Sequence, residues 1–304
     1  MRLFGWDLRK RHDRGPLKGN FFGHIDLPRI KEGGLKGAMW SITTNPFRTA
    51  AGRWRVFTEN LDRIRSSIER SPGLSIACTH SEYQAVRKTG AHACMLAVQG
   101  GNCFDAAPAI PDRLITRVTL LHLLNSKLGA TSAPTHRLKA HKGLSDRGRE
   151  LVKELDRLRI FVDLAHIHPD GFWDAVQLHD RSLPLIATHT GVSGATPHWR
   201  NLDDRQLRAI ADTGGVAGII FSDNFLQPGG VIGHMQHIID TVGEDFVAIG
   251  SDYDGAITPP AELREGAASY PNLIQQMLDR GWRTERIEKV LGKNFLRAFA
   301  AMRP

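Results

Sequence analysis

Short apolar runs recur along the chain, each followed by a polar or glycine-containing segment. A continuous apolar run bounded by loop residues is typical of a strand buried on both faces, as in a parallel sheet covered by helices. The runs that we interpret as strand candidates are residues 37–42, 74–79, 93–98, 114–122, 160–166, 183–190, 216–221 and 246–251.

Segments with helical periodicity separate these runs. Phe57, Leu61, Ile64 and Ile68 repeat at intervals of four, three and four residues, which predicts an amphipathic helix that ends at Pro72-Gly73. Further helices are expected at residues 145–158, 172–178, 234–242, 270–279 and 284–302, and one more between a cap at 201–204 and Gly214-Gly215. Strands that alternate with helices predict a parallel α/β fold, and this number of units favours a TIM-type (β/α)8 barrel. Because no linker rich in Pro, Ser or Gly divides it, we expect residues 1–304 to form a single domain.

Composition argues against membrane and exported classes of protein. Hydrophobic residues make up 41% of the chain, but no apolar run is long enough to cross a bilayer. The basic N-terminus is not followed by the apolar core of a signal peptide. Cys78, Cys94 and Cys103 form no C-x-x-C pair and lie within or beside apolar runs. We therefore expect reduced thiols in a cytoplasmic protein with no membrane partner.

The net charge of +8 and the pI near 9.7 raise the question of nucleic-acid binding. The basic residues, including those at 9–11 and 136–142, are scattered among acids along helical patterns, and no nucleic-acid module is present. The charge therefore indicates a solvated basic surface, and we expect no nucleic-acid partner.

Histidines stand at the ends of three strand candidates. His122, His166 and His189 lie there, and the run at 246–251 opens into S-D-Y-D-G. Parallel barrels carry their chemistry at the C-terminal ends of the strands, so we expect these side chains to converge. Two imidazoles brought together in this way are half of a zinc site. Asp163 is interpreted as a partner of a ligand or a buried, hydrogen-bonded carboxylate, rather than as a ligand itself.

The other histidines carry less information. His168 and His198, which flank the motif, are interpreted as rim residues. Six more show no functional pattern and are interpreted as surface or loop residues, namely His80, His92, His136, His141, His234 and His237.

An ordered set of motifs extends over nearly the whole chain. It comprises H-I-D-L-P-R-I-K-E-G-G-L-K-G-A-M-W-S from His24, T-L-L-H ending at His122, G-L-S-D-R-G-R-E-L-V at 143–152, D-L-A-H ending at His166, A-T-H-T around His189, R-N-L-D-D from Arg200, G-S-D-Y-D-G at 250–255, P-N-L from Pro271, R-G-W from Arg280 and a final G-K-N-F-L-R. In these motifs the chain resembles the membrane (renal) dipeptidase family of zinc metallopeptidases, as a divergent bacterial-type member. That family consists of α/β barrels, and the resemblance is also compatible with a homodimer.

The resemblance implies a role for each residue at the strand ends. His166 and His189 would be ligands of one zinc ion, and His122 would hydrogen-bond the substrate carbonyl or the tetrahedral intermediate. Arg200 would hold the free carboxylate of a small dipeptide, a pairing that suits the forked guanidinium. Asp252 would contact the substrate amino group and carry a proton to the leaving nitrogen. The zinc would polarise the amide and provide hydroxide at neutral pH.

Two elements of the family's metal site are altered. The family builds two zinc sites from a His-x-Asp pair on the first barrel strand, a bridging glutamate and the two later histidines. Gln99 stands where the glutamate belongs, and a neutral amide is at best a weak third ligand. His24-Ile25-Asp26 matches the His-x-Asp pattern, but in the family the block that follows it here lies well downstream of the metal-binding strand. We therefore interpret His24 and Asp26 as loop residues. These changes favour one zinc rather than two, or none.

Two functions therefore stand open. One is a zinc-dependent hydrolase of a small dipeptide or related compound, whose activity the altered metal site would impair. The alternative is a catalytically degenerate relative that binds a peptide-like ligand without cleaving it. The resemblance places the first barrel strand before Met1. A barrel lacking that strand has two unpaired edges, so we expect this chain to be less stable than one extended upstream, or to cover the gap with residues 1–20.

Overall fold

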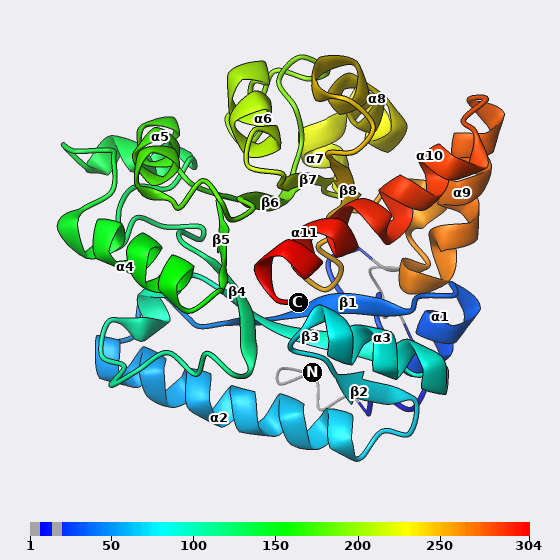
Figure 1. Ribbon diagram of the computed structural model, residues 1–304, viewed down its shortest axis with the longest axis horizontal. Coiled ribbons are helices and arrows are strands. Elements are labelled where there is room, and N and C mark those ends of the chain that lie inside the picture. The colour runs from blue at the N-terminus through cyan, green and yellow to red at the C-terminus, as the bar shows by residue number, and fades with distance from the viewer. Residues whose placement is uncertain (1–6, 14–19) are drawn as a thin grey trace.

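The computed structural model describes residues 7–13 and 20–304, and its centre is one parallel sheet (Figure 1). The strands follow the order β1-β3-β4-β5-β6-β7-β8, and β2 pairs with β3 beside this path. Their bounds are Gly37–Thr43 (β1), Leu74–Ile76 (β2), His92–Gln99 (β3), Ile115–Thr119 (β4), Phe161–Asp163 (β5), Ile186–Thr190 (β6), Val216–Ile219 (β7) and Val247–Ile249 (β8). Every strand candidate thus contains a strand, and the parallel α/β fold of the TIM-barrel type is confirmed.

Helices surround this sheet in Figure 1. They are Leu27–Glu32 (α1), Ala50–Glu69 (α2), His80–Thr89 (α3), Asp146–Arg157 (α4), Pro169–Leu178 (α5), Asp204–Ala211 (α6), Asp223–Leu226 (α7), Gly230–Val242 (α8), Tyr270–Asp279 (α9), Thr284–Glu288 (α10) and Asn294–Met302 (α11). Helices α1, α3 and α7 were not predicted, because each is short or carries few apolar residues. In the described part of the chain, no helix combines the length and apolar character needed to cross a membrane.

The closing helix predicted at 284–302 is interrupted. A π-helical turn, Lys289–Lys293, separates α10 from α11, and Gly292 within it leaves the helical conformation. The apolar periodicity continues through this turn, so the pattern alone did not reveal the break. After the break, α11 begins at Asn294, and Phe299 and Met302 of this helix pack against the sheet.

Two apolar clusters enclose the sheet. The larger cluster includes Leu96, Val98 and Val162 and extends to the surrounding helices. The smaller one joins side chains near the N-terminal ends of the strands, such as Met95 and Phe161, to α11. Apolar packing therefore fills one end of the barrel interior and leaves the C-terminal strand ends for polar groups.

The sheet is open between β8 and β1, for which no pairing exists among the described residues. A segment before α1 lies along this side, where Phe21 forms an antiparallel bridge with Ile257. The amides of Gly23 and His24 donate to Asp254 Oδ1 at 2.8 and 2.9 Å. Of the residues 1–20 expected to cover the gap, 1–6 and 14–19 lie outside the described residues.

His24 and Asp26 do lie in a loop, but both side chains are fully buried. Asp26 is the N-cap of α1, where its side chain accepts from the amide of Arg29 and pairs with the Arg29 guanidinium. His24 Nδ1 accepts from the amide of Asp254 at 3.0 Å. Their chemistry therefore serves to anchor this segment to the loop after β8.

Close backbone approach positions the strand that carries His189. A Cβ on Gly250 would lie 2.0 Å from the carbonyl oxygen of Thr188 and 2.9 Å from the Cα of His189. We expect Gly250→Ala to push β6 away and to lower the free energy of unfolding by about 1–3 kcal/mol, the usual cost of overpacking. Urea denaturation would measure the loss. Gly233→Ala is the control, because a Cβ there meets nothing within 4 Å in α8; equal stability of the two variants would contradict the prediction.

Candidate active site

Four of the predicted side chains meet at the C-terminal ends of neighbouring strands. His166 Nε2 and His189 Nε2 are 2.8 Å apart. The Gln99 amide nitrogen lies 3.5 Å from His166 Nε2 and 3.4 Å from His189 Nε2. The ring of His122 stands edge-on to that of His166, with centroids 4.9 Å apart. The predicted convergence of these strand ends is therefore observed.

Two site residues have the left-handed backbone conformation. His166 has φ +66° and Asp252 has φ +54°, values that residues other than glycine seldom adopt. Such conformations are costly and are typically found where a side chain must be aimed at a functional site. Each of the two residues lies in the turn that directly follows its strand.

A hydrogen-bond chain sets the proton position on His189. Thr188 Oγ1 donates to Asp163 Oδ2 at 2.6 Å. Its hydroxyl proton is thus engaged, so Thr188 Oγ1 accepts from His189 Nδ1 at 2.8 Å. With the proton on Nδ1, the neutral imidazole keeps its lone pair on Nε2, the atom that faces His166 and Gln99.

Asp163 is buried and hydrogen-bonded on both oxygens, as the sequence predicted. Besides Thr188, its carboxylate accepts from the Thr119 hydroxyl at 2.5 Å and from the amides of Ala165 and Thr188 at 3.1 and 2.9 Å. These bonds join the ends of β4, β5 and β6, so Asp163 holds in place the strand that carries His189.

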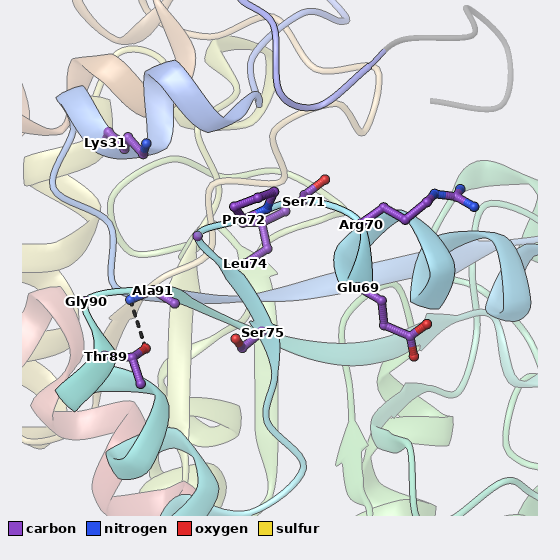
Figure 2. Close-up of a pocket in the computed structure, with 11 residues that line it drawn as sticks. Lys31, Glu69, Arg70, Ser71, Pro72, Leu74, Ser75, Thr89, Gly90 and Ala91 are labelled. Atoms are coloured by element: carbon purple, nitrogen blue, oxygen red, sulfur yellow. Dashed lines mark hydrogen bonds between the residues drawn. The ribbon is translucent and has the colours of Figure 1, made fainter.

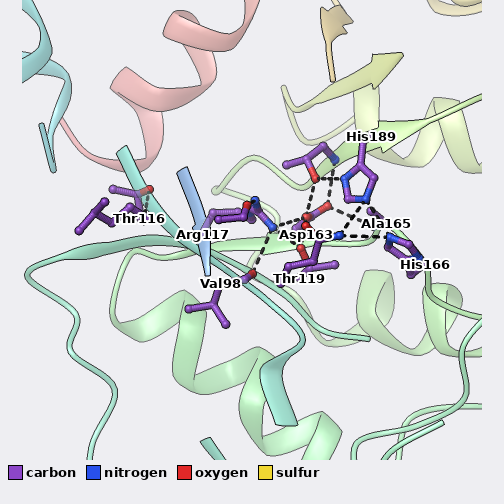
Figure 3. A network of polar contacts seen from close by, with 12 residues as sticks. Val98, Thr116, Arg117, Thr119, Asp163, Ala165, His166 and His189 are labelled. Atoms are coloured by element: carbon purple, nitrogen blue, oxygen red, sulfur yellow. Dashed lines mark hydrogen bonds and ion pairs between the residues drawn. The ribbon is translucent and has the colours of Figure 1, made fainter. Parts of the chain in front are cut away.

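Arg117 was missed by the sequence analysis. This buried side chain of β4 reaches across the barrel interior, where Nη1 donates to Asp163 Oδ2 and to the Val98 carbonyl, both at 3.1 Å (Figure 3). It also contacts the hydroxyls of Thr119 and Ser41. The available signal was a lone charge inside the run L-I-T-R-V-T-L-L-H.

Arg200 and Asp252 add opposite charges to the site. Arg200 is buried and donates from Nη2 to the His189 carbonyl oxygen at 2.6 Å. Burial lowers its pKa to about 10, against the opposing effect of Asp252 and Asp163. Asp252 keeps some contact with solvent, but loss of water around it raises its pKa to about 7, although Arg200 and Arg117 oppose this.

The three histidines are neutral at physiological pH. Burial is the main cause that lowers the pKa of His122 to about 4 and the pKa of His166 and His189 well below 6.5. The positive charge of Arg200 acts in the same direction on all three. A neutral imidazole is the form that binds a metal ion.

The two histidines and Gln99 offer a small set of possible metal donors. They are the two Nε2 atoms and the Gln99 amide, which would present its oxygen after a half-turn. Among residues 7–13 and 20–304, no group of three or more His, Cys, Asp or Glu side chains is placed to hold a metal. Without a carboxylate between them, two divalent cations would lack the negative charge that keeps them together.

Two histidines interpreted as surface or loop residues are buried. His234 lies inside α8, where Nδ1 accepts from the Val192 amide at 2.9 Å, and burial lowers its pKa to about 4. His92 begins β3 and contacts the Leu35 carbonyl at 3.1 Å. Both predictions were wrong because one histidine carries no periodicity of its own, and only the packed neighbours determine its burial.

A wide, open groove lies at the opposite end of the strands (Figure 2). Its volume is about 780 Å³, and its walls come from the start of β2, the ends of α2 and α3 and the residues just before β3. The charged residues along it are Lys31, Glu69 and Arg70, and it contains no histidine or cysteine. The candidate functional side chains therefore lie at the other end of the barrel, where the histidines converge.

The chain is similar in sequence to known proteins. The dipeptidase tcpJ of Claviceps purpurea (strain 20.1) is 29% identical over 306 residues, covering 94% of this chain and 71% of that protein. An uncharacterized protein in the pqqA 5' region of Klebsiella pneumoniae is 38% identical over 165 residues, which are 51% of this chain and 59% of that protein. This chain thus matches less than two thirds of the Klebsiella protein's length.

Among solved structures, a metallopeptidase from Rhodobacter sphaeroides, liganded with a phosphinate mimic of the dipeptide L-Ala-D-Ala, superposes with a TM-score of 0.82. It is 25% identical, and the match covers 92% of this chain and 90% of that one. The family model described as membrane dipeptidase, peptidase family M19, matches residues 4–303. The chain therefore belongs to the membrane dipeptidase family of peptidases, family M19.

Proposed function

We propose that this protein is a hydrolase with a single zinc ion that cleaves the amide bond of a small dipeptide or related compound. The observation that carries the proposal is the convergence of His166 Nε2 and His189 Nε2, 2.8 Å apart, with the Gln99 amide within 3.5 Å of both. These three side chains would hold the ion. When bound, it supplies Lewis-acid polarisation of the scissile carbonyl and a nucleophile from water near neutral pH.

The residues around the proposed zinc site suit a dipeptide substrate. Arg200, buried and tied to the His189 carbonyl, presents a fixed cation for the terminal carboxylate. Asp252 would accept a proton as the nucleophile forms and pass it to the leaving nitrogen, and a pKa of about 7 suits both directions of transfer. Neutral His122 would hydrogen-bond the carbonyl oxygen where negative charge develops. The dipeptide mimic bound by the Rhodobacter sphaeroides relative supports this class of substrate.

A second candidate is ligand binding without cleavage. It is favoured by the neutral Gln99 and because, in the part of the chain that the structure describes, no group of three or more His, Cys, Asp or Glu side chains is placed to hold a metal ion. Arg200, Asp252 and His122 would then bind a peptide-like molecule in the same place.

Zinc stoichiometry separates the two candidates. We expect the purified, zinc-supplied chain to hold about one zinc ion and His166→Ala to hold none, because the remaining ligands are too few. His80→Ala is the control, since His80 lies at the start of α3 and contacts Gln84. Zinc would be measured by mass spectrometry of folded, dialysed protein. A folded wild-type chain without zinc would reject the hydrolase and leave the binding function.

A further inference from the structure

A small cavity adjoins His166 between three loops of the barrel. Its volume is about 20 Å³, enough for one water molecule or one ligand oxygen. Ser132 contributes from the segment between β4 and α4, His166 from the segment after β5, and Trp199 and Arg200 from the segment after β6. The cavity therefore touches both the proposed metal site and the proposed carboxylate site.

Two residues that line this cavity each carry a buried donor with no hydrogen-bond partner in the structure. These donors are Ser132 Oγ and Arg200 Nε, and the side chains are 7% and 4% exposed. A buried polar atom without a partner costs free energy. Two such donors on residues that line one oxygen-sized space favour an anionic oxygen as its occupant.

Both donors are fixed to the strand ends that carry the histidines. The Ser132 amide donates to the His166 carbonyl at 2.7 Å, and the Thr131 hydroxyl donates to the same oxygen at 3.0 Å. Arg200 is fixed by its side chain, whose Nη2 donates to the His189 carbonyl. These hydrogen bonds therefore fix the position of Ser132 relative to the proposed active site.

We propose that Ser132 is a substrate-binding residue whose hydroxyl donates to one oxygen of the terminal carboxylate, beside Arg200. This rests on the proposed function for the nature of the ligand, but it does not require turnover. Ser132 and Arg200 both offer protons there, so a carboxylate oxygen completes the cavity. A terminal carboxamide would bring further N–H protons to a space that already holds donors, and it is discriminated against.

The test measures binding rather than catalysis. Calorimetry would compare alanyl-alanine with a reduced peptide bond, which cannot be hydrolysed, and its C-terminal carboxamide on wild type and Ser132→Ala. A hydrogen bond to a charged group predicts a loss of about ten- to one-hundredfold in affinity for the carboxylate ligand. Affinity for the carboxamide should change less than threefold.

Thr135→Val is the matched control, because Thr135 Oγ1 is another buried, unpartnered hydroxyl of the same segment but does not line the cavity. Thermal melting would confirm that each variant is folded. Unchanged affinity of Ser132→Ala for the carboxylate ligand, or equal losses for both ligands, overturns the proposal, as does a wild type that binds neither. Failure of the hydrolase function would instead appear as binding without zinc or cleavage.

Discussion

Replacing Arg117 by methionine should lower the free energy of unfolding by about 3–5 kcal/mol, because the change leaves the Asp163 carboxylate buried without its cation. The two side chains are 3% and 0% exposed, and Arg117 Nη1 lies 3.1 Å from Asp163 Oδ2. Water cannot replace the lost charge at that depth. Urea denaturation, with linear extrapolation to zero denaturant, measures the difference.

The control is Arg147→Met, which removes an exposed pair with Glu150 and should cost less than about 1 kcal/mol. The double variant Arg117→Met with Asp163→Asn removes both charges and should recover much of the loss, since the penalty comes from the unpaired charge. Equal losses for Arg117→Met and Arg147→Met, or no recovery in the double variant, would show that the buried pair does not hold the barrel together.

Replacing Asp252 by asparagine should lower kcat for a dipeptide by about 10²- to 10⁴-fold, the usual contribution of a positioned acid or base. The amide cannot accept and return a proton. Zinc content should remain at the wild-type value, because Asp252 is not among the proposed ligands. Asp170→Asn serves as control, since Asp170 is exposed at the start of α5. Full activity of Asp252→Asn would remove this residue from the mechanism.

The raised pKa of Asp252 also predicts two opposite pH effects. Only the ionised carboxyl accepts a proton, so kcat/KM should rise as the pH increases through about 7. The residual activity of Asp252→Asn should not show this rise. The same carboxyl should make the folded protein less stable as the pH rises. Folding favours the protonated carboxyl, so its stabilising contribution is complete below about pH 4 and is lost as pH rises through about 7. Unfolding curves of both proteins between pH 4 and 8 would reveal that trend.

The sequence by itself determined the strands, most helices and the meeting of His122, His166 and His189. These follow from local facts, because an apolar run reports burial on both faces and parallel strands bring their C-terminal ends to one side. The family resemblance added Arg200 and Asp252, which no periodicity marks.

Only the tertiary structure decided what lies between these elements. Arg117 reaches Asp163 because Thr119 pairs with Asp163 across β4 and β5, and that register places both side chains in the barrel interior. The lone pair on His189 Nε2 depends on Thr188 and Asp163 together. Ser132 meets Arg200 at a cavity that joins loops distant in sequence. A pattern along one chain records how deeply a residue is buried, whereas its partners depend on register and on the path of each loop through space.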